Sequence, residues 1–416
     1  MKYLKEQSQL SFIMYLLITL FFIELFLGGG GRLFVIAGVP VRMILYSIIF
    51  LIYSLALIFG RAKLVLDFDS IIIFILLFWF FVSASIGIIK NHNLDLIVED
   101  IKPLSFFAIY FPLNYYIMIK KYPVKSIFSI LKWAGIIISF VTLIILLIGK
   151  IFDFSVVYQA VSSLSGESNE FMFRPNGAAF YKGHLYVMVA FFIYITEYFI
   201  NGKSLISILP IVICGLSLFL AGTRGLMVGT VFGLVYILFI YFKKLSTKTI
   251  LSGLMLIITS LFLFFMFTDY SDVNRISSDV WSEDVGVETR MDFLDEGTDI
   301  IIGSPITLLV GNGFGTELSR RPQHLEVSFF DILLEQGLVG LTLWWILLFR
   351  IAFLIIRITR YNKRDSLAHA LGAGVIVLVV FTNTNPFINN PIGIGFLIVT
   401  ILALKQSYLK AIGVDS

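Results

Sequence analysis

Long runs of apolar residues alternate with short polar segments along almost the whole chain. A transmembrane helix needs about 20 mainly apolar residues, and this length criterion predicts about twelve such helices. We expect them near residues 10–28, 41–60, 70–89, 100–119, 127–149, 184–200, 204–221, 225–242, 250–268, 337–356, 367–384 and 392–409. No internal repeat or low-complexity linker divides the pattern, so residues 1–416 are predicted to form a single membrane domain.

Composition indicates the same fold class. The sequence is 58% hydrophobic and only 14% charged, and its mean hydropathy is +0.95. These values exclude an ordinary soluble domain and predict an all-α polytopic membrane protein. The single cysteine, Cys214, cannot form an intrachain disulfide, and a thiolate metal site is not expected. The first apolar run has no small-residue cleavage site, so we interpret it as a retained helix.

The distribution of Lys and Arg predicts the orientation in the membrane, because cytoplasmic loops carry an excess of these residues. With both termini in the cytoplasm, the basic segments fall on the cytoplasmic side. These segments are RAKLVLDFD, KKYPVK, NGKS, KKLSTK, RITRYNKR and the C-terminal tail. The formal charge of +4 is spread over these short loops. It therefore reports topology and does not indicate a nucleic-acid partner.

Two long segments are predicted on the outer side, at about residues 150–183 and 269–336. Loops of this length in a compact domain are usually functional or disordered. Apolar residues at helical spacing, as in MDFLDEGTDIII, predict that these loops are partly helical. We expect the two loops to cover the active site.

Two arginines at the predicted outer surface, Arg224 and Arg290, have no acidic residue three or four positions away. Arg275 differs, because Asp272 and Asp279 at helical spacing are typical of a local ion pair. A folded arginine without a local partner must find one elsewhere, and a ligand is one candidate. For Arg224, contact with phospholipid head groups is the other interpretation.

A polar stripe is predicted in the segment that precedes the tenth span. In a helix that begins near Pro322, the residues His324, Ser328, Asp331 and Glu335 lie within about 40° of one another. One interpretation is a surface helix with its polar side in water. In the other, the stripe lines an outward-facing cavity with His324 at its mouth.

Lys182 precedes the sixth span and His184 opens it, and we expect both in the same outer cavity. The sequence contains no metal motif, nucleotide-binding glycine loop or Ser-His-Asp pattern at recognisable spacing. LDLIVED is only a weak match to an acidic metal-binding pair. A site without metal or cofactor is therefore predicted.

Four short motifs follow one another in the second half of the chain. They are FRPNGAAFYKGHLY (173–186), GTRG (222–225), TRMDFLDEGTDIIIGSPITLLVGNGFG (289–315) and HLEVSFFDILLEQGLVG (324–340). Their order, spacing and predicted outer location resemble the O-antigen polymerase and O-antigen ligase group (Wzy and WaaL type). One position departs from the group's pattern. Leu325 follows the histidine where the group usually has Asn, so no role is carried over from that Asn.

The resemblance implies a fold like that of GT-C glycosyltransferases and a location in the bacterial cytoplasmic (inner) membrane. Enzymes of this group move a glycan from undecaprenyl diphosphate to an acceptor hydroxyl on the periplasmic face, with inversion at the anomeric carbon. The partners implied are a lipid-linked oligosaccharide donor, a similar acceptor, the membrane and a chain-length regulator protein.

The group's chemistry suggests roles for the candidate residues. Arg224 and Arg290 are predicted to hold the donor diphosphate, with Arg174 as a third candidate, because arginine matches phosphate oxygens and stays ionised. His324 would contact the diphosphate or accept the proton of the acceptor hydroxyl.

Further residues are predicted to complete the site. Either Glu326 or Glu335 is the alternative base. Substrate-binding roles are expected for Lys182, His184 and Asp331.

Two alternatives stay open from the sequence. An O-antigen ligase would use lipid A–core as its acceptor in place of a second lipid-linked repeat unit. A lipid-linked oligosaccharide flippase or other transporter is a second class, although such proteins typically show repeated halves and broken helices. The polymerase is the favoured interpretation.

Overall fold

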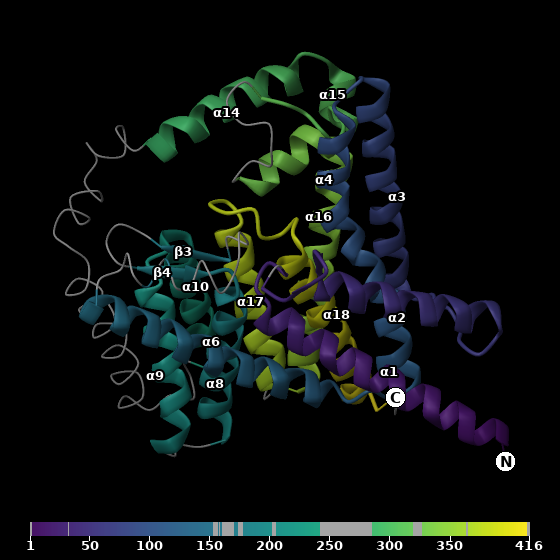
Figure 1. Ribbon diagram of the computed structural model, residues 1–416, viewed down its shortest axis with the longest axis vertical. Coiled ribbons are helices and arrows are strands. Elements are labelled where there is room, and N and C mark those ends of the chain that lie inside the picture. Colours follow the sequence, from purple (N-terminus) through teal and green to yellow (C-terminus); the bar gives the residue numbers. More distant parts are fainter. Residues whose placement is uncertain are drawn as a thin grey trace.

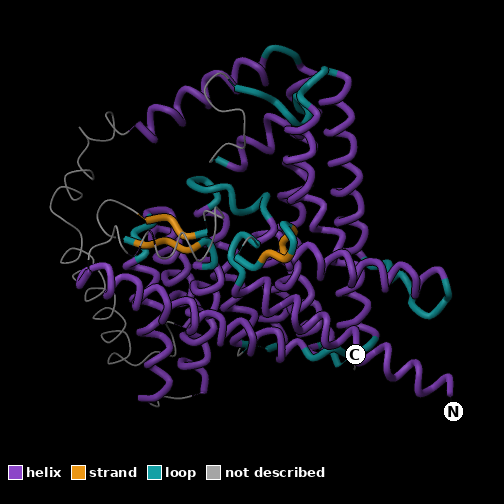
Figure 2. Tube along the Cα trace, in the orientation of Figure 1, coloured by secondary structure: helices purple, strands orange, loops and turns teal. Residues whose placement is uncertain are grey.

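The computed structural model describes residues 2–31, 33–152, 157, 159, 170–173, 178–201, 205–241, 285–318, 327–362 and 365–413. Within these ranges the protein is almost entirely helical, as Figures 1 and 2 show. Two small antiparallel hairpins are the exceptions: β1 (Val35–Ile36) pairs with β2 (Val39–Pro40), and β3 (Phe171–Phe173) pairs with β4 (Ala179–Tyr181).

The α-helices follow the order of the apolar runs. They are α1 (Lys2–Leu27), α2 (Val41–Ile58), α3 (Phe68–Ile89), α4 (Leu94–Leu104), α5 (Tyr110–Asn114), α6 (Val124–Phe152), α8 (His184–Asn201), α9 (Leu205–Leu220), α10 (Arg224–Tyr241), α14 (Val285–Ile302), α15 (Pro305–Val310), α16 (Ser328–Tyr361), α17 (Ser366–Phe381) and α18 (Pro391–Ala411).

Among the described residues, five helices are long and apolar enough to cross a membrane: α2, α3, α6, α16 and α18. Shorter apolar helices lie within α1, α8, α9, α10 and α17. These helices coincide with all predicted spans except 100–119 and 250–268. The all-α, multi-pass character is therefore confirmed. Residues 250–268 lie outside the described part of the chain, so the total of twelve stays a prediction.

The span predicted at 100–119 is not one continuous α-helix. The chain there passes from α4 into a 3₁₀ turn (η1, Ser105–Ile109), then α5, then a π-helical turn (η2, Tyr115–Ile119). Pro103 lies inside α4 and Pro112 inside α5. Proline lacks the N–H that continues an α-helix and its ring crowds the preceding turn. The two prolines explain why the helical geometry changes along this segment.

The helices pack in two neighbouring groups. In one, α8 lies against α6, α9 and α17, and α10 runs along α17; in the other, α16 packs against α3 and α18. Close approach depends on glycines: a Cβ at Gly229 of α10 would lie 2.6 Å from Val377, and one at Gly233 would lie 2.4 Å from Phe192. Small residues allow such helix contacts in membranes.

Ion pairs with at least one buried partner join neighbouring helices, both consecutive ones and ones that are distant in sequence. Arg42 Nε of α2 lies 2.6 Å from Glu24 Oε2 of α1, and Arg350 Nε of α16 lies 2.6 Å from Asp69 Oδ1 of α3. Charged side chains within a membrane protein are costly unless they are paired. These contacts therefore hold the helices in a defined arrangement.

The elements that build the candidate site lie at one end of the molecule. In Figure 1, α14 and α15 lie at the top beside α4 and the upper part of α3, and both termini lie in the lower part. α14 packs against α15 and α16. The helix predicted for MDFLDEGTDIII is confirmed as part of α14.

Candidate functional site

The first turns of α16 carry the predicted polar stripe. The helix begins at Ser328, later than the expected start near Pro322, and non-helical backbone at Gly337 (φ 68°, ψ −172°) separates these turns from the rest of the helix. The side chains of Ser328, Asp331 and Glu335 are 0%, 3% and 5% exposed. The interpretation of a surface helix with its polar side in water is therefore wrong.

The opposite side of these turns is also covered. The ring of Phe329 stacks on Trp345 with a centroid distance of 5.3 Å. Phe330 and Leu333 pack against a small cluster that includes Phe293 of α14. Because both sides are occupied, the stripe points into the protein and its polar atoms need internal partners.

Some of these partners come from residues 382–390, the connection between α17 and α18. Asn389 Nδ2 donates to Asp331 Oδ2 at 3.1 Å, and Ser328 N donates to the carbonyl oxygen of Thr382 at 3.1 Å. The connection itself is held by a hydrogen bond of 2.9 Å from Ile388 N to Thr382 Oγ1. The sequence alone does not identify this segment as part of the site. Its signal is the run TNTNPFINN between two apolar runs.

A third acidic residue, Asp100 of α4, joins the stripe. The carboxyl of Glu335 neighbours those of Asp331 and Asp100 and is hydrogen-bonded to Asp100. The three carboxyl groups therefore form one buried acidic cluster. In the sequence, Asp100 stands out only as the last residue of the weak match LDLIVED.

The glycine turn at residues 311–315 fixes the distance between these carboxyl groups. Asn312 N donates to the Leu334 carbonyl at 2.7 Å, and Gly313 N donates to the Glu335 carbonyl at 3.0 Å. At the next corner, Gly315 N donates to Asp100 Oδ2 at 2.7 Å. The turn thus clamps α16 to α4. The G-x-G motif positions the site through its backbone.

The same turn is also bound to the end of α3. Phe314 N donates to the carbonyl of Ser83 at 3.1 Å, and Lys90 Nζ donates to Asn312 Oδ1 at 2.6 Å. Partial desolvation lowers the pKa of Lys90. Three segments that are far apart in the chain therefore meet at this turn.

For Arg224 and Arg290, the structure describes the position in the chain but not the side chain. Arg224 is the first residue of α10, and Arg290 lies in α14. Their side chains lie outside the described part of the structure. The start of α10 lies against the connection that holds Asp331, because a Cβ at Gly225 would lie 1.9 Å from Thr384 Oγ1. The backbone of Arg224 is therefore next to the candidate site.

Three further candidates fall outside the described residues altogether: Arg174, His324 and Glu326. Their predicted roles are not tested. Glu170, four residues before Arg174, is fully buried, and its Oε2 accepts from Gly30 N at 2.5 Å.

His184 and Lys182 lie at the junction of β4 and α8. The His184 side chain is fully buried: Nδ1 lies 3.0 Å from Tyr181 N and 2.7 Å from Tyr181 O, and Nε2 lies 3.2 Å from Ser217 Oγ. In this arrangement the ring ties β4 to α9 rather than facing an outer cavity. Lys182 is half-buried, and its backbone N–H donates to the Glu170 carbonyl at 3.1 Å. Substrate binding by either side chain stays a prediction.

Comparison with known proteins adds two findings. A family described as O-antigen ligase matches residues 209–345, from α9 to the first half of α16. A protein named O-antigen polymerase from Shigella flexneri is 26% identical over 396 residues, which cover 92% of this chain and 93% of that relative. The family match contains the glycine turn and the polar stripe. The likeness to the polymerase extends over the N-terminal helices as well.

Proposed function

We propose that this chain, which is similar to O-antigen polymerases and ligases, is a membrane glycosyltransferase that polymerises O-antigen or a related surface polysaccharide. The substrates are glycans carried on undecaprenyl diphosphate: one serves as donor and a second as acceptor. A chain-length regulator protein is a further partner in this proposal.

The observation that carries the proposal is the near-full-length likeness to a protein named O-antigen polymerase. The ligase family match covers only residues 209–345. That region holds the candidate site, which would serve either acceptor. The likeness in the remaining helices favours the polymerase.

The donor side of the reaction is assigned to arginines. The leaving group is a diphosphate, a stable anion that needs positive charge and hydrogen bonds more than a proton. Arg224 and Arg290 would bind it bidentately and stabilise the charge that develops as the sugar–phosphate bond breaks. His324 and Arg174 would complete this contact. Because the diphosphate leaves as an anion, the proposal requires no metal ion.

The acceptor side is assigned to the carboxyl cluster. An ionised carboxylate among Asp100, Asp331 and Glu335 takes the proton of the acceptor hydroxyl, and the hydroxyl oxygen attacks the anomeric carbon of the donor. The new glycosidic bond forms as the bond to the diphosphate breaks, with inversion of configuration. His324 or Glu326 are the alternative bases. The burial of the cluster supports this assignment, because a dry site strengthens its electrostatic effect.

We place the reaction on the periplasmic face of the bacterial inner membrane, with both termini in the cytoplasm. The basic loops support this orientation. Another support is that the glycine turn is bound to α4, which lies with α15 in the upper part of Figure 1, whereas both termini lie in its lower part.

The test is complementation of a strain that lacks its O-antigen polymerase, with lipopolysaccharide separated by gel electrophoresis. Restored ladders of many repeat units are expected. A strain that lacks its ligase is the matched recipient: restored attachment there, without ladders in the polymerase-null strain, would identify a ligase. Transfer of lipid-linked sugar across vesicles without lengthening would contradict both assignments.

The arginine assignment has its own test. Arg224→Ala should abolish the ladders at normal expression, because the donor diphosphate loses a charged partner. Arg357, on the later part of α16, offers a control: Arg357→Ala should keep the ladders. Near-normal ladders with well-expressed Arg224→Ala protein would refute the role of Arg224.

A further inference from the structure

A cavity of about 610 Å³ lies beside the carboxyl cluster. It is formed where the loop after α1, the start of α2, the end of α4 with η1, and the first residue of α18 meet. Its size is within the range of pockets that bind small organic ligands, roughly 300–1,000 Å³. The mechanism above assigns it no role.

The lining of the cavity is polar and carries no excess of positive charge. It contains two basic side chains, Arg42 and Lys102, and two acidic ones, Glu99 and Asp100. A site for a diphosphate would carry an excess of positive charge. This lining offers hydrogen-bond donors and acceptors in similar supply, which is the requirement of an uncharged ligand rich in hydroxyl groups.

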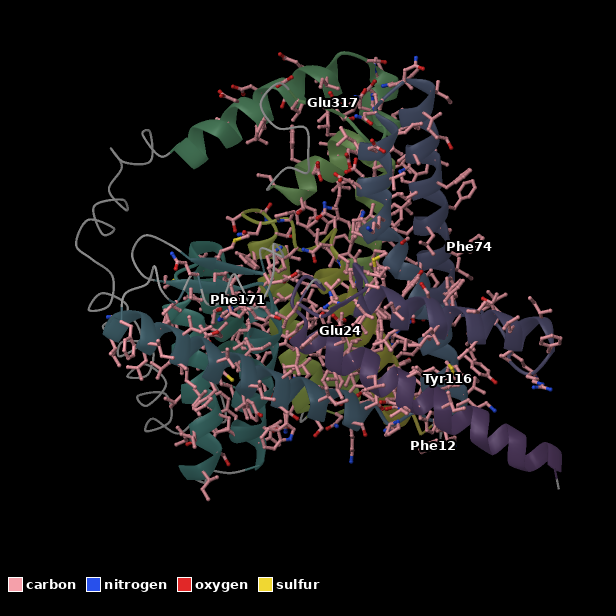
Figure 3. All side chains as sticks on the ribbon, viewed as in Figure 1. Phe12, Glu24, Phe74, Tyr116, Phe171 and Glu317 are labelled. Carbon is pink, nitrogen blue, oxygen red and sulfur yellow. The ribbon has the colours of Figure 1, made fainter. Side chains whose placement is uncertain are left out.

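Arg42 illustrates how the charge is cancelled. The side chain is 3% exposed, and its Nε donates to Glu24 Oε2 at 2.6 Å. Its Nη2 donates to the Gly29 carbonyl at 2.8 Å. Nη1 has no hydrogen-bond partner among the described residues. Glu24, labelled in the interior in Figure 3, therefore neutralises the guanidinium but leaves one buried donor unused.

The loop after α1, which contains Gly31, lies directly against this guanidinium. At Gly31, which lines the cavity and has φ +92°, an added Cβ would lie 3.1 Å from Arg42 Nη1. Because glycine has no side chain, the backbone can approach the guanidinium this closely. Gly31 and Arg42 both line the cavity, so this donor lies at its wall.

An aromatic wall completes the cavity. The ring of Tyr46 stacks on that of Phe106 with a centroid distance of 5.8 Å and an interplanar angle of 21°. The Tyr46 hydroxyl is oriented by donation to the Ser105 carbonyl at 3.1 Å. Flat aromatic surface with a few oriented polar groups is the usual construction of a specific ligand pocket. It matches a sugar ring, which has both C–H faces and hydroxyl edges.

Asp100 connects the cavity to the proposed chemistry. Its carboxyl lines the cavity and is also hydrogen-bonded to Glu335. A hydroxyl group that enters the cavity and reaches Asp100 is therefore next to the proposed base. On this geometry and on the proposed function, we propose that the cavity is the acceptor-glycan subsite and binds an uncharged sugar unit of the lipid-linked acceptor.

The experiment fills the cavity with a bulky side chain. Ser47 lines the cavity on α2, and Leu51, one turn further along, is 58% exposed and does not line it. Ser47→Trp is the test variant and Leu51→Trp its matched control. Both are prepared as full-length protein in lipid nanodiscs, and unchanged melting temperatures show that each is folded.

The probe is the repeat-unit oligosaccharide released by mild acid from the lipid-linked units of the source strain. A photoreactive derivative is crosslinked to the protein and the sites are mapped by mass spectrometry. Crosslinks to α2 and α4 are expected in the wild type and the control, and affinity at least about tenfold weaker is expected in Ser47→Trp. Tyr46→Leu, which removes one ring of the aromatic wall, should weaken binding of the oligosaccharide by a smaller factor than Ser47→Trp.

Wild-type affinity in Ser47→Trp would overturn the proposal. Equal loss of undecaprenyl diphosphate binding in Ser47→Trp would also overturn it, because the cavity would then hold the lipid head group. The two hypotheses remain distinguishable. If the glycan binds the wild type but not Ser47→Trp, and no polymer forms in either, the subsite stands and the proposed function fails. If Ser47→Trp polymerises with unchanged KM, the function stands and the subsite fails.

Discussion

Gly313→Ala tests whether the glycine turn holds the site together. The backbone at Gly313 has φ +91°, and an added Cβ would lie 2.4 Å from the backbone nitrogen of Gly87 in α3. That nitrogen belongs to a helix and cannot rotate away as a flexible side chain would. The substitution must therefore displace the turn, strain the end of α3, or both.

The magnitude has two parts. A left-handed backbone conformation at a residue with a Cβ costs about 1–2 kcal/mol. Overpacking of a filled site adds about 1–3 kcal/mol. Gly38→Ala separates the two, because Gly38 has φ +79° but nothing within 4 Å of its added Cβ. Gly313→Ala should therefore be less stable than Gly38→Ala by about 1–3 kcal/mol.

Stability is measured by unfolding the purified protein from detergent micelles with increasing SDS, followed by tryptophan fluorescence. Activity is measured as lipopolysaccharide ladders in the complemented strain. Gly313→Ala should shorten or abolish the ladders, because displacement of the turn removes its hydrogen bonds to Glu335 and Asp100. Equal stability of the two variants together with normal ladders for Gly313→Ala would refute the clamp.

Two further predictions concern charged groups. Asp69→Asn leaves Arg350 without its ion-pair partner and should destabilise the protein by about 3 kcal/mol in the same unfolding assay. Lys132→Gln breaks a half-exposed ion pair and should cost less than about 1 kcal/mol. Equal losses of stability in the two variants would contradict the role of burial. Glu335→Gln keeps the shape of the side chain but removes its acid–base function, so ladder formation should fall about 100-fold or more. Glu317→Gln, at the exposed position labelled near α15 in Figure 3, is its control, and equal activity of the two variants would exclude Glu335 as a base.

The membrane helices were largely predictable because hydropathy reports the environment directly. A bilayer requires long apolar helices, and the described helices coincide with most predicted runs. The continuous span predicted at residues 100–119 was wrong for a reason that lies within the segment itself. Pro103 and Pro112 are visible in the sequence, but apolarity alone does not show that the helix changes its geometry there.

The candidate site was only half predictable. Helical spacing placed Ser328, Asp331 and Glu335 on one face, which the structure confirms, but did not show whether water or protein covers that face. Asp100 and Asn389 were not identified as part of the site. Their local sequences carry no catalytic signature, and they reach the stripe only through tertiary contacts.

Apolar run length, loop charge and motif order were therefore sufficient to predict a multi-pass membrane protein and its similarity to O-antigen polymerases and ligases. These properties depend on how each segment interacts with lipid or water, or on short local patterns. Which carboxyl groups lie together, and that a cavity opens beside them, depends on how α4, α16 and the glycine turn meet. Periodicity defines a face of a helix, but only packing decides what lies against it.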